Sequence, residues 1–409
     1  MTRFARPTAL IALLLGAGLL LPTGLAVAAT PTIQSDLDAV ACPSATVCVA
    51  VGGIAHEVVQ KGAVKSGSWT PYAVWSSDAG VHWTRMSVPS VPNLFLTSVA
   101  CAAVTQCSAV GAIDAIQTGQ WAQVGSAALF LSAANKWSSA SIPTGTQPLN
   151  SVSCPAVSRC VAVGGNRTGN TLTMLPSVLH STTGGRTWSQ ASSSGLSKGL
   201  LYGLACPTTS RCMAVGVNTG GGQNGGYNSR PVAIRTTDGG TRWSSSKISS
   251  SAGGGPLALG CTSTSTCVGV GDQFVSCGCG TGEPGTYAHA WVTSNVGKKY
   301  ADHLLPQEGS FFVWYLWAIS CWSTGCETTG EASHAKPGSP MVPITIELSS
   351  KNGWTGSGPH GNVPTVLRSQ WIYGLHCWSA AKCVGVGQDY KNKAAIETSA
   401  KNVWTSRTP

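Results

Sequence analysis

The stretch from Leu37 to Gly53 reads LDAVACPSATVCVAVGG and contains two cysteines, one on each side of a short polar segment. An apolar segment, a polar turn and a valine-rich segment that ends in glycine are together typical of a β-hairpin. Opposed residues of an antiparallel pair have Cα atoms about 4.5–5.5 Å apart, which a disulfide can span. We therefore predict a hairpin whose two shoulders are joined by a disulfide.

The same pattern recurs along the whole chain, and the first cysteines of successive pairs are 52 to 60 residues apart. A fixed period of this length is the mark of a repeat fold. Each small disulfide loop should contribute at most about 2 kcal/mol of stability. Metal binding is the alternative for such pairs, but no histidines match them. The seven predicted disulfides are Cys42–Cys48, Cys101–Cys107, Cys154–Cys160, Cys206–Cys212, Cys261–Cys267, Cys321–Cys326 and Cys377–Cys383.

A second motif occupies the second half of each unit and is clearest in SSDAGVHW (Ser76–Trp83) and TTDGGTRW (Thr236–Trp243). STTGGRTW (Ser181–Trp188) and TSNVGKKY (Thr293–Tyr300) are altered copies. Aspartate can accept backbone N–H bonds within its own turn, glycine allows unusual backbone angles, and tryptophan buries against a sheet. We interpret the motif as scaffold, with a ligand site on the turn as the alternative. Its structural residues are Asp78, Gly80, Trp83, Gly185, Trp188, Asp238, Gly240 and Trp243.

The pattern Ser-x-Asp-x-Gly-x-x-Trp resembles the Asp-box, or BNR, repeat of sialidase-like β-propellers. The combination of AVG with a following TTDGG-x-x-W is similar to the repeats of propellers related to photosystem II stability and assembly factors. The resemblance implies a propeller fold for nearly all of the mature chain. It implies no single function, because glycosidases, receptors and assembly factors all carry Asp boxes.

Seven units predict an all-β, seven-bladed propeller of four-stranded antiparallel blades over residues 29–409, with one hairpin disulfide per blade. The blades should start near residues 37, 96, 149, 201, 256, 316 and 372. Since strand direction alternates, the cysteine turns and the Asp boxes should share one face. The opposite face, with its variable loops, is the expected binding face.

One position of the repeat, four residues before the first cysteine, should surround the axis or its mouth. Aromatic residues at such a mouth can stack on sugar rings or anchor a partner, and packing between blades is the alternative. The position holds Asp38, Thr97, Asn150, Tyr202, Leu257, Trp317 and Tyr373. The predicted binding residues are Asp38, Asn150, Tyr202, Trp317, Trp371 and Tyr373.

Several acidic residues follow the glycine of the valine-rich segment, and we expect them in the loops between the second and third strands. A pair of them could serve glycoside hydrolysis, and turn formation is the alternative. The arginine cluster of a sialidase cannot be matched, so no catalytic residue is assigned. These acids are Glu57, Asp114, Asp272, Glu331 and Asp389.

Cys277 and Cys279 lie outside the repeat and are interpreted as a local disulfide that staples a loop, with a soft-metal site or a redox pair as alternatives. We expect neither a metal nor a cofactor. Residues 1–28 have the positive start, apolar core and small residues of a cleaved signal peptide, with an uncleaved anchor as the alternative.

The predicted product is a secreted monomer without a stable membrane span. Its 25 Lys and Arg residues against 15 Asp and Glu give a net charge of +10, but they are scattered, so we expect no nucleic-acid binding. The predicted function is non-enzymatic binding of a protein or a cell-surface glycan. The alternatives are a carbohydrate-active enzyme and an assembly factor for an exported or membrane complex.

Overall fold

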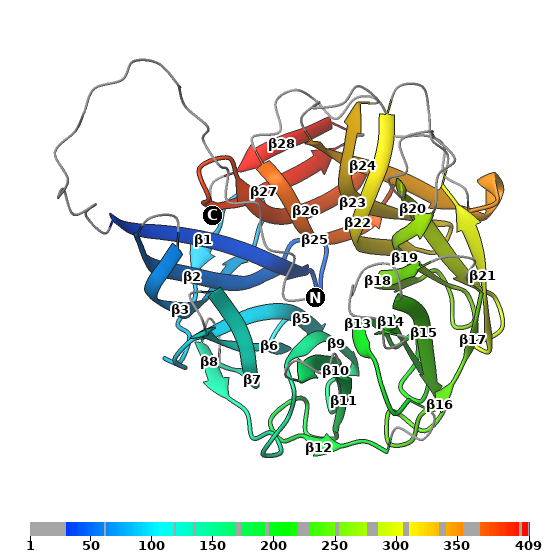
Figure 1. Ribbon diagram of the computed structural model, residues 1–409, viewed down its shortest axis with the longest axis horizontal. Coiled ribbons are helices and arrows are strands. Elements are labelled where there is room, and N and C mark those ends of the chain that lie inside the picture. The colour runs from blue at the N-terminus through cyan, green and yellow to red at the C-terminus, as the bar shows by residue number, and fades with distance from the viewer. Residues whose placement is uncertain are drawn as a thin grey trace, which may run out of the picture.

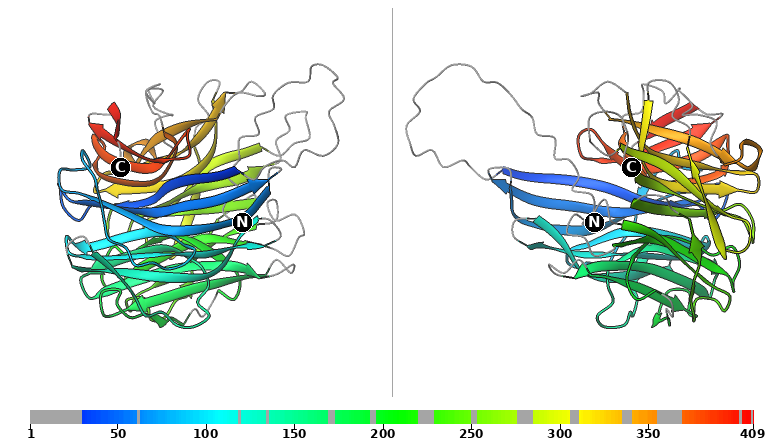
Figure 2. Two further views of the ribbon diagram at one scale, coloured as in Figure 1. Left: turned by 90° about the vertical axis from the view of Figure 1, so that its left-hand side faces the viewer. Right: turned by 45° about the vertical axis from the view of Figure 1, so that its right-hand side comes forward.

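Seven antiparallel sheets surround a central axis, which makes the protein a seven-bladed β-propeller (Figure 1). We describe it from a computed structural model that places residues 30–60, 63–117, 120–133, 136–168, 173–192, 196–219, 229–249, 253–275, 285–305, 311–334, 341–354, 369–400, 403–407 and 409. Seen from the side, the strands of neighbouring blades lie in successive layers (Figure 2). The fold class predicted from the sequence is confirmed.

The first four blades each have four strands in sequence order, with the first strand innermost (Figure 1). Blade 1 contains β1 (Thr30–Ala41), β2 (Cys48–Gln60), β3 (Ala63–Ser76) and β4 (Thr84–Arg85). Blade 2 contains β5 (Leu94–Ala103), β6 (Gln106–Gln117), β7 (Gln120–Ala133) and β8 (Lys136–Ser139). Blade 3 contains β9 (Leu149–Ala156), β10 (Arg159–Thr168), β11 (Thr173–Ser181) and β12 (Ser189–Gln190). Blade 4 contains β13 (Leu200–Ala205), β14 (Cys212–Thr219), β15 (Ser229–Thr236) and β16 (Ser244–Ser245).

The last three blades differ in strand number. Blade 5 contains β18 (Gly253–Cys261), β19 (Cys267–Val275), β20 (Gly285–Thr293) and β21 (Lys299–Leu304), and β17 (Lys247–Ile248) adds a fifth, parallel strand at its outer edge. In its described part, blade 6 contains β22 (Phe311–Trp322), β23 (Gly325–His334) and β24 (Met341–Ser349), followed by the 3-10 turn η2 (Ser350–Asn352). Blade 7 contains β25 (Ser369–Ser379), β26 (Lys382–Asp389), β27 (Ala394–Ala400) and β28 (Val403–Arg407).

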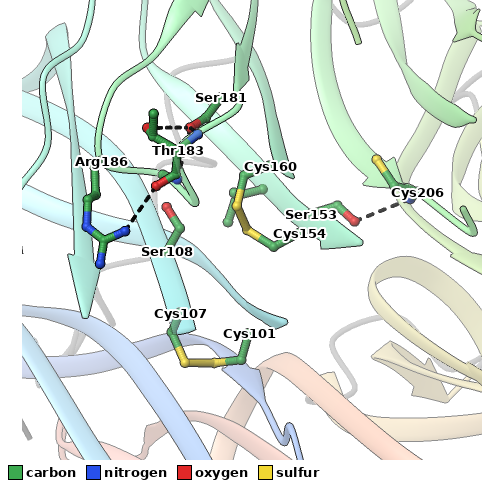
Figure 3. Close-up of a disulfide and its surroundings, with 12 residues drawn as sticks. Cys101, Cys107, Ser108, Ser153, Cys154, Cys160, Ser181, Thr183, Arg186 and Cys206 are labelled. Carbon is green, nitrogen blue, oxygen red and sulfur yellow. Dashed lines mark hydrogen bonds between the residues drawn. A yellow bond between two sulfur atoms is a disulfide. The ribbon is translucent and has the colours of Figure 1, made fainter. Parts of the chain in front are cut away.

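All seven predicted hairpin disulfides are present, one in each blade (Figure 3 shows those of blades 2 and 3). Their Cα atoms are 3.9–4.1 Å apart, because the two cysteines face each other across the first two strands. Cys277 and Cys279 lie outside the described residues.

The second strands are almost wholly apolar because both of their faces are buried between blades. In blade 3, Val161 and Val163 pack against Ala214 and Ile234 of blade 4. Cys160 and Ala162, which alternate with those valines, pack toward blade 2 in the cluster that contains Val110. A strand covered on both faces loses the apolar–polar alternation of a half-exposed strand.

A glycine in each second strand is required by the close approach of the inner strand. A Cβ atom built on any of these glycines would overlap the carbonyl oxygen of the residue just before its inner-strand partner, so a larger residue forces the two strands apart. The seven glycines are Gly52, Gly111, Gly164, Gly216, Gly271, Gly330 and Gly387.

The ring closes through packing and hydrogen bonds between blades 7 and 1, and β1 is the inner strand of blade 1. Ser35 anchors this junction: its N–H donates to the Asn392 carbonyl at 3.0 Å, and its hydroxyl accepts from the Ala394 N–H at 2.9 Å. The Gln388 side chain donates to the Ser35 carbonyl at 3.3 Å. Residues 30–36 therefore join blade 1 and touch blade 7 from the side.

The seven disulfides indicate an oxidising, extracytoplasmic compartment. In the part of the chain that the structure describes, no helix is long and apolar enough to span a membrane. Residues 1–28, the predicted signal peptide, lie outside the described residues.

Replacing a close-approach glycine should destabilise the ring. We expect Gly216→Ala to lower the free energy of unfolding by about 1–3 kcal/mol, because the new methyl group would collide with the Leu200 carbonyl. Denaturant unfolding measures the change. Gly125→Ala is the matched control, since a Cβ there meets only Ile113 at 3.9 Å. Equal stability of the two variants would contradict the packing argument.

The disulfide pattern predicts the thiol content. Sixteen cysteines minus the fourteen in seven disulfides leave two, so unfolded, unreduced protein should show no more than two free thiols. Titration with a thiol reagent in denaturant gives the count. Three or more free thiols would show that at least one blade lacks its bridge.

Candidate functional site

The Asp-box turns are closed by their own side chains. The Asp78 carboxylate accepts the backbone N–H groups of Val81 and His82 at 3.1 and 2.9 Å, and donation by His82 lowers the pKa of Asp78 well below its usual range. Asp238 accepts two backbone N–H groups in the same way, both at 3.0 Å. In the altered copies, the side-chain oxygens of Thr183 and Asn295 replace the carboxylate as acceptors. These bonds satisfy the carboxylates locally and support the scaffold interpretation.

The rest of the box fastens one blade to the blade before it. The indole N–H groups of Trp83, Trp188 and Trp243 donate to the carbonyls of Gly80, Gly185 and Gly240 at 2.8, 3.0 and 2.9 Å. Each of these glycines packs on the residue that follows the second cysteine of the preceding blade: Val384 under Gly80, Ser108 under Gly185 and Val161 under Gly240. Figure 3 shows the blade 3 turn lying over Ser108.

Every inner strand contains a β-bulge at the same place. In every blade, the pairing between the first and second strands skips the residue that lies four positions before the first cysteine. A bulge bends the strand and re-aims its side chain. The skipped residues are Asp38, Thr97, Asn150, Tyr202, Leu257, Trp317 and Tyr373, the set singled out in the sequence.

Two of the bulged side chains form hydrogen bonds with the next blade. The Thr97 hydroxyl donates to the Leu149 carbonyl at 2.8 Å, and the Asn150 amide donates to the Leu201 carbonyl at 2.9 Å. Tyr202 packs against Leu200 and Val217 of its own blade. Interblade bonding and packing therefore account for these side chains, and ligand roles for Asn150 and Tyr202 stay predictions.

The bulge of blade 6 forms an aromatic cluster with blade 7, which we call the aromatic corner: Tyr315, Trp317 and Trp371. Tyr315 and Trp317 are stacked, with ring centroids 5.5 Å apart and an interplanar angle of 12°. Trp371 meets Trp317 edge-on at 6.2 Å and 74°. The three side chains are partly exposed. In blades 2 and 4, the equivalent positions are at the start of the inner strands β5 and β13. The cysteine turns follow the ends of the inner strands, so the aromatic corner lies at the mouth on the opposite side of the ring.

The corner joins two of the predicted binding residues and adds one that was missed. Trp317 and Trp371 come together, and Tyr373 is the bulged residue of blade 7. Tyr315 was missed because it does not occupy the repeat position examined. The sequence did contain an indication of its role, because Tyr315 precedes Trp317 by two residues, as Trp371 precedes Tyr373. Asp38 lies on blade 1, where its carbonyl approaches Gly374 of blade 7.

The acids do not occupy the predicted loops. Four of them lie within the second strands, and Asp389 is the last residue of β26. The prediction was wrong because these strands continue past their glycines. Only Asp389 performs turn chemistry, since its carboxylate accepts the N–H groups of Lys391 and Lys393 at 2.8 and 2.9 Å.

Two of these acids are deeply buried and titrate abnormally. Asp272 is 2% exposed and Glu331 is 4% exposed. Burial raises the pKa of Asp272 to about 7 and that of Glu331 to about 8. Their carboxylates do not form a pair, because each belongs to a different interblade surface. Asp272 lies on the same face of β19 as Val270, which packs against blade 6, and Gln273 lies on the opposite face. Glu331 faces blade 7.

The orientation of Glu331 follows from its neighbours in the sheet. Two residues before it, the Thr329 hydroxyl donates to the Ile372 carbonyl of blade 7 at 3.0 Å, so this face of β23 packs on blade 7 beside Trp371. Glu331 is also the cross-strand partner of Tyr315. The carboxyl group is therefore placed at the aromatic corner.

Basic and metal-ligating residues are not gathered at a site. Arg85 lies over the Tyr72 ring within blade 1, and Arg186 of blade 3 lies over the Phe130 ring of blade 2. Arg230 and Arg235 belong to β15 of blade 4. No group of three His, Cys, Asp or Glu residues in the described ranges could hold a metal ion. A separate buried network in blade 5 links Gln273 and His289 to Asp302, at 2.9 and 2.7 Å.

Comparison with known proteins places the chain by fold. No protein-family model and no curated protein sequence matches it. Its fold is similar to that of YCF48 bound to D1 peptide, with a TM-score of 0.53 and 10% identity over 91% of this chain and 96% of that one. It also aligns with a GH93 alpha-L-arabinofuranosidase of Fusarium graminearum (TM-score 0.43, 10% identity, 91% and 93% covered) and with Trypanosoma rangeli sialidase (0.43, 10%, 90% and 65%). The resemblance to Asp-box propellers is confirmed as a likeness of fold.

The buried acids predict an inverse pH dependence of stability. Burial raises the pKa of Asp272 and Glu327 to about 7 and that of Glu331 to about 8, whereas unfolded carboxyl groups titrate near pH 4. Between these values the folded state binds more protons, so the free energy of unfolding should fall as pH rises from about 4 to 8. Denaturant unfolding across this range tests it. The double variant Asp272→Asn, Glu331→Gln should flatten the dependence, and an unchanged slope would contradict the assignment.

Proposed function

We propose that this chain is a secreted, non-enzymatic propeller that binds a protein or a glycan at the mouth between blades 6 and 7. The observation that supports this most is the aromatic corner, where three large rings from two blades meet without being fully buried. Partly exposed aromatic rings held in fixed positions are common anchors of binding sites, since they offer apolar area at little cost in side-chain entropy.

The asymmetry of the ring supports the same location. The positions equivalent to Tyr315 and Trp371 hold no ring in blades 1, 3, 4 and 5, and the ring at the blade 2 position, Phe95, is fully buried against Trp69. A side chain needed only for the scaffold would be expected to repeat with the scaffold, as the Asp-box tryptophans do. The concentration of rings at one junction favours a role that the other junctions do not share.

A polypeptide ligand receives further support from the comparison with YCF48, whose structure contains a bound D1 peptide. The same fold in an assembly factor makes a partner protein of an exported or membrane complex a reasonable form of this proposal. At 10% identity the likeness concerns the fold, so the site itself must carry the assignment.

A carbohydrate-active enzyme is the second candidate, favoured by one observation. Glu331 is buried beside aromatic rings, and its raised pKa keeps it protonated at neutral pH, as a general acid for glycoside hydrolysis requires. That reaction also needs a second carboxylate about 5–10 Å away. Asp272 faces a different blade interface, and Glu327, four residues along the same strand, is about 13 Å from Glu331 along β23. Binding without hydrolysis is therefore the better-supported function.

The proposal predicts that binding depends on the aromatic corner. We would screen oxidised, signal-cleaved protein on a glycan array and on a peptide array, and then measure the affinity of each hit. Trp317→Ala should weaken the hits about tenfold or more, because stacking area at the centre of the site is lost. Tyr390→Ala, at a side chain 60% exposed in the β26–β27 turn, is the control.

Undiminished binding by both Trp317→Ala and Trp371→Ala would place the ligand elsewhere on the protein. Release of reducing sugar from a bound glycan, lost in Glu331→Gln, would establish the enzyme in place of the binding module.

A further inference from the structure

The inner strands carry a charge pattern opposite to that of the whole protein. The chain has a net charge of +10, yet the described inner strands contain no Lys or Arg, and their only charged residues are Asp36 and Asp38 of blade 1. Blade 1 follows blade 7 around the ring, so these acids flank the aromatic corner on one side. A mouth lined by one sign of charge with low-dielectric walls attracts ligands of the opposite sign.

Blades 6 and 7 continue this pattern behind the corner. Strands β22 to β27 contain the acids Glu327, Glu331, Glu347, Asp389 and Glu397, and Lys382 is their single Lys or Arg. The other described Lys and Arg residues of these blades are Lys351 of η2, Lys391 and Lys393 of the β26–β27 turn, and Arg407 of β28. The Lys382 ammonium lies at the cysteine turn, where it donates to the Ala45 carbonyl and covers the Trp378 ring at 4.5 Å. It is therefore engaged at the far end of the blade.

Glu331 has no compensating partner of its own. It is 4% exposed, and the described part of the chain offers its carboxyl group no hydrogen bond or ion pair. A buried carboxylate without a partner is costly, and a bound cation would remove that cost. The equivalent positions in blades 1 to 4 hold Gly53, Ala112, Gly165 and Val217, so this acid is not a requirement of the repeat.

The rings beside Glu331 suit a particular kind of cation. Tyr315 and Trp317 are stacked, and Trp371 stands nearly perpendicular to Trp317. The faces of aromatic rings carry the negative part of the ring quadrupole and attract organic cations, and aromatic cages bind quaternary and methylated ammonium groups in this way. A metal ion would instead need several oxygen, nitrogen or sulfur ligands, which the described residues do not assemble.

We propose that the mouth between blades 6 and 7 binds an organic ammonium group, which the aromatic corner surrounds and the Glu331 carboxylate neutralises. This inference rests on the proposed binding function and names the chemistry of its ligand. The group can be the side chain of a lysine or methylated lysine in a polypeptide, or a free amine such as choline.

Proton linkage gives this site a signature that packing alone would not produce. Burial raises the pKa of Glu331 to about 8 in the unliganded protein, so binding of a cation at lower pH must release its proton. The affinity should therefore increase about tenfold from pH 6 to pH 7 and level off above pH 8. Tyr315 faces Glu331 from β22. The other acids on this interface are Glu327 and Glu347 of blade 6 and Glu397 of blade 7. His376 stays neutral in this pH range because burial lowers its pKa to about 4.

The test compares choline with its neutral isostere 3,3-dimethylbutan-1-ol by calorimetry and by tryptophan fluorescence on the full mature protein. We expect choline to bind at least about tenfold more tightly than the alcohol, with the stated pH dependence. Glu331→Gln should remove both the preference and the pH dependence, and Trp371→Leu should weaken choline binding about tenfold. Glu327→Gln is the matched control, because it removes a buried acid from the same face of the same strand, four residues away.

A second arm identifies the source of the ammonium group. An acetylated and amidated tripeptide with a central trimethyl-lysine, bound more tightly than choline, would assign the site to a polypeptide side chain. Weaker binding of that peptide would assign it to a free amine. Both results support the ammonium site.

Equal affinity for choline and the alcohol, or an unchanged pH dependence in Glu331→Gln, would overturn the inference. If hits from the array screen then still depended on Trp317, the proposed binding function would stand without it. Circular dichroism and thermal unfolding of each variant separate loss of binding from loss of fold.

Discussion

The close approach of each inner strand to a glycine in the second strand is the constraint on which the rest of the molecule depends. Because the glycine has no side chain, the inner-strand carbonyl can occupy the space of a Cβ atom, as the Leu200 carbonyl does at Gly216. The extra residue of the bulge follows within two positions. The bulge re-aims one side chain of each blade, and through it Thr97, Asn150 and Trp317 contact the next blade.

The repeat is structurally uniform on one side of the ring and chemically uneven on the other. At the cysteine turns, the Asp boxes use the same bonds in every clear copy, and substitution of Asp by Thr183 or Asn295 preserves them. At the mouth, the position after the close-approach glycine changes from small or apolar residues in blades 1 to 4 to Asp272, Glu331 and Gln388 in blades 5 to 7. The scaffold tolerates this change because its stability comes from the disulfides, the Asp boxes and the interblade clusters. The uneven side is where a selective interaction can be added without altering the fold.

Propellers of this kind separate fold from function. The chain shares its fold with a protein that holds a peptide in its structure, so the architecture leaves open what is bound and whether it is changed. The distinction between binding and hydrolysis depends on individual carboxyl groups. Here Glu331 adjoins aromatic rings, whereas Asp272 faces a different blade interface and Glu327 lies four residues away on the strand of Glu331.

The sequence by itself determined the repeat, the seven disulfides, the interpretation of the Asp box as scaffold and the recurring position before the first cysteine, because each depends on residues close together in the chain. That this position is a β-bulge came from the structure. Only the tertiary structure decided which of those positions meet. Trp317 and Trp371 are separated by 54 positions and come into contact because consecutive blades are adjacent in the ring. The length of the second strands was equally hidden, since a strand buried on both faces shows no alternation and its end cannot be read from a glycine. Because these strands are longer than predicted, the acids lie in the blades and not in the loops. Burial in the assembled ring then raises the pKa of Glu331 beside the aromatic corner.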